Sequence, residues 1–248
     1  MTLFVVIVLA LGAQRPAPQP PRTPVLIELF TSEGCSSCPS ADALLIRLLE
    51  TQPVAGVDII PLAFHVDYWD RLGWKDPFST PAFTRRQQDY SAIFGADRVY
   101  TPQLVADGRA ELVGSDERVA LDAIRKAAAL PHMDVRVSAS ARGTDAIRVA
   151  VEAPAAGTQT EPIDIVAVLV EDRLISPVRR GENSGKTLAH SAVVRRQQAI
   201  GALERGPFVG EGEWRLNKAW ARPNLRVVAF LQGRTTRRVY GAASAPVQ

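Results

Sequence analysis

The two cysteines of this 248-residue chain, Cys35 and Cys38, are its best candidates for chemistry because they stand in the segment GCSSCP. Two intervening residues allow one sulfur to attack a mixed disulfide formed on the other, which is what thiol–disulfide exchange requires. The pair lies between an apolar run typical of a strand (25–30) and a leucine-rich run typical of a helix (41–50). A thiol at a helix start is stabilised as the thiolate by the helix dipole and by free N–H groups. The sequence therefore predicts Cys35 as the nucleophile and Cys38 as the resolving thiol.

The same cysteine spacing also occurs in metal sites and in structural disulfides. A structural zinc site needs four ligands, and the sequence has no second cysteine pair and only three histidines, His65, His132 and His190. Cu(I) suits two thiolates with His65 as a third ligand, but the only methionines to support such a site are Met1 and Met133. A disulfide that closes so short a loop adds little stability. Redox chemistry without a resident metal or cofactor is the preferred interpretation, a copper-binding or metallochaperone protein is the first alternative, and a non-catalytic binding module is the second.

The elements that must position the dithiol continue with a predicted strand (57–66), an aromatic and charged insertion (65–99), a hairpin (103–114) and an amphipathic helix (115–130). Asp107-Gly108 between apolar runs is typical of a two-residue hairpin turn.

The insertion begins with three polar or aromatic residues of interest, His65, Asp67 and Trp69. Parallel strands deliver their carboxyl ends to one edge of a sheet, so we expect the start of the insertion to border the dithiol. One interpretation is that His65 or Asp67 relays protons to Cys38 and that Trp69 forms a platform for substrate. The other is that His65 only caps a strand and that Trp69 only packs a small core.

This order of elements, together with Cys35, Cys38 and the Thr101-Pro102 dipeptide, resembles the thioredoxin superfamily. In that superfamily a cis proline faces the CxxC pair and leaves the backbone of the preceding residue free to pair with a bound peptide. The resemblance implies a cis Pro102 and a substrate-binding role for Thr101 and Pro102. A trans proline that opens an edge strand is the alternative.

The segments 28–45, 64–79 and 99–108 are similar, more closely, to a domain-of-unknown-function family of bacterial secreted thioredoxin-like proteins. That resemblance implies an α/β thioredoxin-like domain followed by an added β-rich domain. It does not supply a substrate.

The second half of the chain changes from helical periodicity to alternation, most clearly in 132–154, 163–172 and 225–243. Alternation between Gly and Pro turns predicts antiparallel strands, so we expect a thioredoxin-like domain over 23–130 and a sandwich-like β-rich domain over 131–248.

A polar loop in this half contains the segment RGENSGKT, which has one residue too few between its glycines for a phosphate-binding loop. One hypothesis is that this loop packs over the dithiol and presents Asn183 or His190.

The chain opens with a predicted leader over 1–22, made of an apolar run and a proline-rich linker. The run is too short for an ordinary membrane span and lacks a basic start, so membrane attachment is expected only if the leader stays uncleaved. We expect a bacterial periplasmic or secreted protein whose partners are protein or small thiol/disulfide substrates and a redox recycling partner. Nucleic acid is not expected as a partner, because the 29 Lys and Arg are scattered among 26 Asp and Glu without a clustered stripe.

Overall fold

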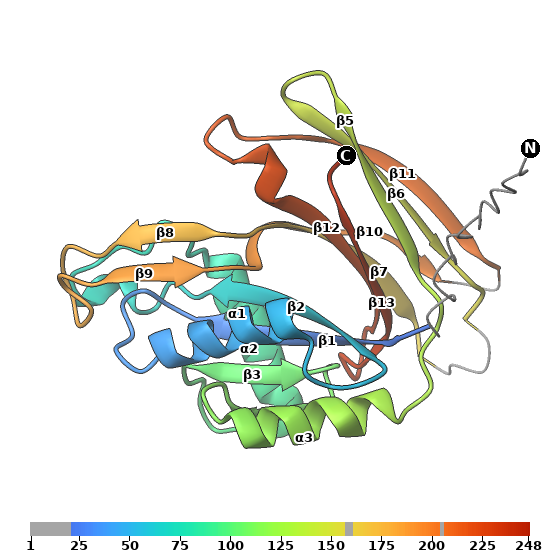
Figure 1. Cartoon of the computed structure of the whole chain (residues 1–248). Coiled ribbons are helices and arrows are strands. Elements are labelled where there is room, and N and C mark those ends of the chain that lie inside the picture. Colours follow the sequence, from blue (N-terminus) through green and yellow to red (C-terminus); the bar gives the residue numbers. More distant parts are fainter. Residues whose placement is uncertain (1–20, 157–160, 204–205) are drawn as a thin grey trace, which may run out of the picture.

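The structure, a computed structural model, describes residues 21–156, 161–203 and 206–248, so residues 1–20 of the predicted leader lie outside it. The fold is mixed α/β and is dominated by one large mixed sheet (Figure 1). The helices are Pro39–Thr51 (α1), Pro81–Phe94 (α2) and Glu117–Ala128 (α3), with short 3-10 turns at Asp70–Leu72 and Arg222–Asn224. The strands of the first half are Thr23–Thr31 (β1), Val57–His65 (β2), Gln103–Ala106 (β3) and Ala110–Val113 (β4). The strands of the second half are Arg136–Arg142 (β5), Ala146–Ala153 (β6), Ile163–Glu171 (β7), Leu174–Pro177 (β8), Thr187–His190 (β9), Val193–Leu203 (β10), Phe208–Arg215 (β11), Leu225–Gly233 (β12) and Val239–Pro246 (β13).

The main sheet has eight strands in the order β13-β12-β7-β10-β2-β1-β3-β4. In the first half β1 pairs with β2 in parallel and with β3 in antiparallel fashion, and β3 forms a hairpin with β4. Helices α1 and α3 cover one face of these strands and α2 covers the other, because alternate residues of β1 pack to opposite sides. The carboxyl ends of β1 and β2 therefore open at one edge, where the CxxC loop and the insertion begin.

The second half of the chain extends the same sheet. Strand β10 meets the outer edge of β2 where Val193 pairs with Ala63, and β7, β12 and β13 follow in antiparallel order. A separate sheet of order β11-β6-β5 packs on one face of β7 and β12. The antiparallel strands predicted after residue 131 are present, but the sandwich is formed between this small sheet and the shared main sheet.

The reason for the shared sheet lies in β2, which is buried at eight of its nine positions. An apolar strand of this kind would leave unpaired backbone groups exposed at a sheet edge. Strand β10 meets that edge at Ala63, whose N–H donates a 2.7 Å hydrogen bond to Ala192 O, and Arg226 Nη2 donates one of 3.2 Å to Pro61 O. The predicted domain boundary between residues 130 and 131 falls in the connection between α3 and β5. Because the main sheet contains strands from both halves, the division into two domains stays a prediction.

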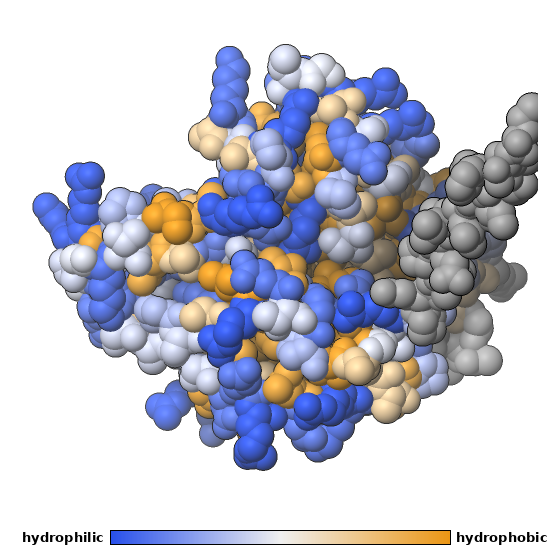
Figure 2. Space-filling view, viewed as in Figure 1, coloured by the Kyte–Doolittle hydropathy of each residue, from blue (hydrophilic) through white to orange (hydrophobic). Residues whose placement is uncertain are grey.

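Exposed apolar surface does not point to a docking face on the side drawn in Figure 2, where hydrophilic side chains separate the hydrophobic patches. Large apolar side chains scattered singly over a surface need no partner to explain them. Those that are exposed come from distant elements: Leu72, Ile93, Val113, Leu130, Ile175 and Val209.

Candidate functional site

Cys35 and Cys38 form a disulfide in the turn that joins β1 to α1. Their Cα atoms are 5.4 Å apart because successive hydrogen bonds fold the turn, from Cys35 N to Ser32 O and from Cys38 N to Cys35 O, both 3.2 Å long. Cys38 is the N-cap residue of α1, and Pro39 occupies its first turn. The dithiol therefore lies at the start of a helix, where the sequence placed it.

The predicted loop at Thr101 and Pro102 lies beside the dithiol. The Thr101–Pro102 peptide bond is cis, and Thr101 O is 3.9 Å from Cys35 Sγ. Trp69 Nε1 donates a hydrogen bond to Thr101 Oγ1 at 2.8 Å, and Trp69 Cβ packs so closely on Gly34 that a β-carbon there would lie 3.1 Å away. The structure thus brings three residues singled out in the sequence, Trp69, Thr101 and Pro102, to one side of the disulfide.

The loop between β8 and β9, residues 178–186, covers the dithiol and is called the strap below. Asn183 Nδ2 donates hydrogen bonds of 2.9 Å to both Glu33 O and Cys35 O, and Glu182 Oε2 accepts one of 2.9 Å from Ser36 N. Both cysteines are 0% exposed. These contacts confirm the hypothesis that the polar loop packs over the dithiol and presents Asn183, and they leave the disulfide closed to solvent.

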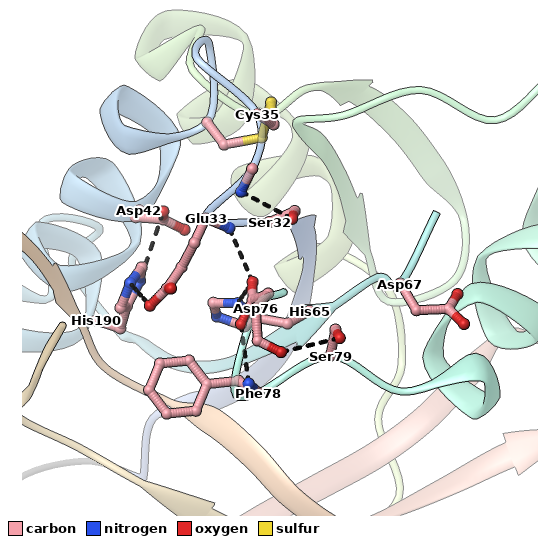
Figure 3. Close-up of polar contacts among 12 residues, drawn as sticks. Ser32, Glu33, Cys35, Asp42, His65, Asp67, Asp76, Phe78, Ser79 and His190 are labelled. Atoms are coloured by element: carbon pink, nitrogen blue, oxygen red, sulfur yellow. Dashed lines mark hydrogen bonds and ion pairs between the residues drawn. A yellow bond between two sulfur atoms is a disulfide. The ribbon is translucent and has the colours of Figure 1, made fainter. Parts of the chain in front are cut away.

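Five titratable side chains form a buried His–carboxylate cluster below the disulfide (Figure 3). His65 Nδ1 lies 2.7 Å from Asp76 Oδ2. His190 lies between two carboxylates, with Nε2 at 3.4 Å from Glu33 Oε1 and Nδ1 at 3.6 Å from Asp42 Oδ2. The two imidazole rings meet edge to face at 5.0 Å between centroids. The cluster consists of Glu33, Asp42, His65, Asp76 and His190, each at most 4% exposed.

Five different segments of the chain supply the cluster. Glu33 follows β1, Asp42 lies on α1, His65 ends β2, Asp76 comes from the insertion and His190 ends β9. Backbone and indole donors hold the carboxylates: Glu33 N donates to Asp76 Oδ2 at 2.8 Å, and Trp74 Nε1 donates to Glu33 Oε2 at 2.6 Å. Side chains held in this way have little freedom to turn toward solvent.

Burial and pairing shift the pKa values of the cluster's side chains in opposite directions. Burial raises the pKa of Asp42, although His190 and His65 oppose it. Burial is the largest influence on the pKa of His65 and would lower it, but Asp76, Asp42 and Glu33 together outweigh burial, and the pKa of His65 is raised. Burial would raise the pKa of Asp76, but His65 and the backbone N–H groups of Glu33 and Phe78 together outweigh burial, and the pKa of Asp76 is lowered. These two shifts favour the charged forms of His65 and Asp76, while Asp42 retains a proton more readily than a free carboxyl does.

Several polar atoms of the cluster have no hydrogen-bond partner among the described residues: Glu33 Oε1, Asp42 Oδ2, His65 Nε2, His190 Nδ1 and His190 Nε2. Buried polar atoms normally bind protein groups or ordered water. Within the part of the chain that the structure describes, no group of three or more His, Cys, Asp or Glu side chains converges as metal ligands do. The arrangement is suited to holding and exchanging protons.

Sequence reasoning located some of these residues and missed others. Asp67 points away from the cluster, since its Oδ1 accepts a hydrogen bond from Thr84 on α2, and the predicted proton relay through Asp67 has no geometric support. Glu33 and Asp42 were missed, although Asp42 stands four residues after Cys38 and so on the same side of α1. Nothing in the local sequence marks Glu182 as a partner of the dithiol loop.

A model of a family described as protein of unknown function (DUF1223) matches residues 26–232. The crystal structure of protein AGR_C_4864 from Agrobacterium tumefaciens is similar at 26% identity and a TM-score of 0.69, over 92% of this chain and 95% of that one. HBP35 of Porphyromonas gingivalis is similar in fold at 15% identity and a TM-score of 0.66, over 93% of this chain and 77% of that one. No curated protein matches. None of the helices in the described residues is long and apolar enough to cross a membrane.

Proposed function

Because the chain belongs to the DUF1223 family of proteins of unknown function, its activity must be argued from its own site, and we propose that it is an exported thiol–disulfide oxidoreductase. Cys35 and Cys38 are the reacting pair. The observation that carries the proposal is the disulfide at the start of α1 with Thr101 O 3.9 Å from Cys35 Sγ. A helix start stabilises a thiolate, and a carbonyl beside the sulfur offers a bound chain a backbone partner.

A thioredoxin-like fold for the first half is part of the proposal. The succession of β1, α1, β2, α2, β3, β4 and α3 agrees with the order on which the resemblance to that superfamily rests. Parallel β1 and β2 place the dithiol at the edge where the insertion also begins. Neither the strand order nor the family match names a substrate.

The proposal assigns nucleophilic attack to Cys35 and resolution to Cys38, with Thr101 and Pro102 as the surface that pairs with substrate. Substrates are proteins or small molecules that carry a thiol or a disulfide, and a separate redox partner recycles the dithiol. A predicted leader and an oxidised CxxC pair both suit a periplasmic or secreted protein, because disulfides persist in oxidising compartments.

The test measures the midpoint potential of the Cys35–Cys38 couple with and without Cu(I), together with exchange activity on a disulfide substrate. We expect a defined two-electron potential and measurable exchange. Cys38→Ser removes the resolving thiol and should accumulate mixed disulfides on Cys35 in an export-competent host, whereas Cys35→Ser should accumulate none. Tight Cu(I) binding without exchange activity would refute the proposal in favour of a copper-binding protein.

A further inference from the structure

His190 is the one member of the buried cluster that comes from the second half of the chain. It is 2% exposed, and the titratable groups that face it are Glu33 from the loop after β1, Asp42 from α1 and His65 from β2, with Asp76 behind His65. The ring of Phe78 also packs near it, at 5.7 Å between centroids. His190 therefore has a carboxylate facing each of its two ring nitrogens inside a buried site.

Neither ring nitrogen of His190 has a hydrogen-bond partner among the described residues, since the distances of 3.4 and 3.6 Å to Glu33 and Asp42 are longer than a hydrogen bond of good geometry. Purely structural histidines in a core are normally hydrogen-bonded, because an unpaired buried polar group is costly. The open nitrogens leave room for a proton or an ordered water to be shared with the carboxylates.

The two carboxylates connect His190 to the dithiol. Glu33 stands two residues before Cys35, and Asp42 stands one helical turn after Cys38, with Asp42 N donating to Cys38 O at 3.1 Å. In Figure 3 the Asp42 carboxylate lies on the disulfide side of His190, and the Glu33 side chain runs from the disulfide loop to the imidazole. In a site of low dielectric constant, a change of charge on the sulfurs would act on all three side chains.

We propose that Glu33, His190 and Asp42 form a proton-exchange group for the dithiol, in which His190 lets the β-rich half of the chain take part in the redox reaction. The inference rests on the oxidoreductase function proposed above and goes further, because it assigns the source of the proton. Burial raises the pKa of the Asp42 carboxyl, which is the direction that a proton donor needs.

When a substrate dithiol is the reductant, it passes two electrons to the Cys35–Cys38 disulfide. One substrate thiolate attacks Cys35 Sγ, the Cys35–Cys38 bond breaks and its electron pair remains on Cys38 Sγ, which takes a proton from the Glu33–His190–Asp42 group. The second substrate thiol loses its proton and attacks the mixed disulfide, so that the substrate leaves as a disulfide and Cys35 leaves as a thiolate. Solvent returns a proton to the group, and the reverse sequence reduces a substrate disulfide.

The experiment compares the parent protein with His190→Gln and with the matched control His132→Gln, which changes a histidine outside the cluster. The rate of reduction by dithiothreitol is measured from pH 5 to pH 9. In a Cys35→Ser background, the pKa of the remaining Cys38 thiol is measured by its thiolate absorbance. General acid–base catalysis contributes about 100-fold or more to a reaction rate. We therefore expect His190→Gln to slow reduction by about that factor near neutral pH and to remove one inflection from the pH profile of the reduction rate.

In the same measurements His132→Gln should retain the parent profile, and the thiol pKa of Cys38 should shift only with His190→Gln. If His190→Gln matches the parent in rate, pH profile and Cys38 pKa, the inference is wrong while the oxidoreductase proposal stands. If the parent protein itself shows no exchange activity, the oxidoreductase proposal is wrong. Should His190→Gln fail to fold, Asp42→Asn and Glu33→Gln undergo the same measurements, and a parent-like profile in both overturns the inference.

Discussion

Replacing Asn183 by alanine should open the strap and speed the reaction of the disulfide. Asn183 is 0% exposed and donates two 2.9 Å hydrogen bonds, to Glu33 O and Cys35 O. Each such bond contributes about 1 kcal/mol, and a buried carbonyl left without a donor adds to the loss, so the closed strap should lose about 2–3 kcal/mol. Since every 1.4 kcal/mol is a factor of ten, access to the sulfurs should rise by about 30- to 150-fold.

The assay is the second-order rate of reduction of the oxidised protein by a small dithiol at fixed pH, with melting temperature recorded for each variant. Asn217→Ala is the matched control, because Asn217 is exposed and its side chain accepts a hydrogen bond from the Ala219 N–H in a turn of the second half. We expect the control to react as the parent does. A parent-like rate in a folded Asn183→Ala protein would show that the strap does not limit access and would refute the reasoning.

Two further predictions concern charge. The hydrogen bond with Asp107 raises the pKa of His132 above its usual value of 6.5. The stability that this pair contributes is therefore fully present below pH 6.5 and is lost as the pH rises through the raised pKa. The free energies of urea unfolding of the parent and of His132→Gln should converge at alkaline pH. Glu28→Gln leaves the buried Arg86 guanidinium without its 2.5 Å carboxylate partner and should lower the free energy of urea unfolding by about 3–5 kcal/mol. The control Glu117→Gln, which breaks an exposed ion pair, should lower it by at most about 1 kcal/mol. Equal effects would contradict the assignment of a buried ion pair.

Local pattern was enough to locate the dithiol and the elements on either side of it. An apolar run, a CxxC pair and a leucine-rich run are neighbours in sequence, so a strand, a turn and a helix follow from periodicity and length. The hairpin at Asp107-Gly108 was equally local, and both residues have positive φ, 46° and 61°, as the predicted turn requires. Strand β11 escaped prediction because its centre reads Gly210-Glu211-Gly212-Glu213, which lacks the apolar alternation of a half-buried strand.

The contacts that complete the site join residues far apart in sequence, and periodicity carries no information about them. The only sign that β2 has a neighbour on its outer edge is its unbroken apolar character, which is typical of a strand buried on both faces but does not say which strand covers it. The position of His190 between Glu33 and Asp42 depends on the pairing of β10 with β2, because that pairing holds the end of β9 beside α1. Its sequence neighbours therefore allowed a hypothesis for His190 but not its partners.

The junction between the halves has a mechanical consequence. Only two residues separate His190 from Val193, and one of them, Ala192, accepts a 2.7 Å hydrogen bond at its O from Ala63 N. A displacement of β10 along β2 would therefore carry the imidazole with it and change its distance from the carboxylates. If the proposed proton exchange holds, a ligand that favours one position of the β-rich half would shift the reduction potential of the dithiol. By thermodynamic reciprocity, reduction of the dithiol would then change the affinity for that ligand by the same factor.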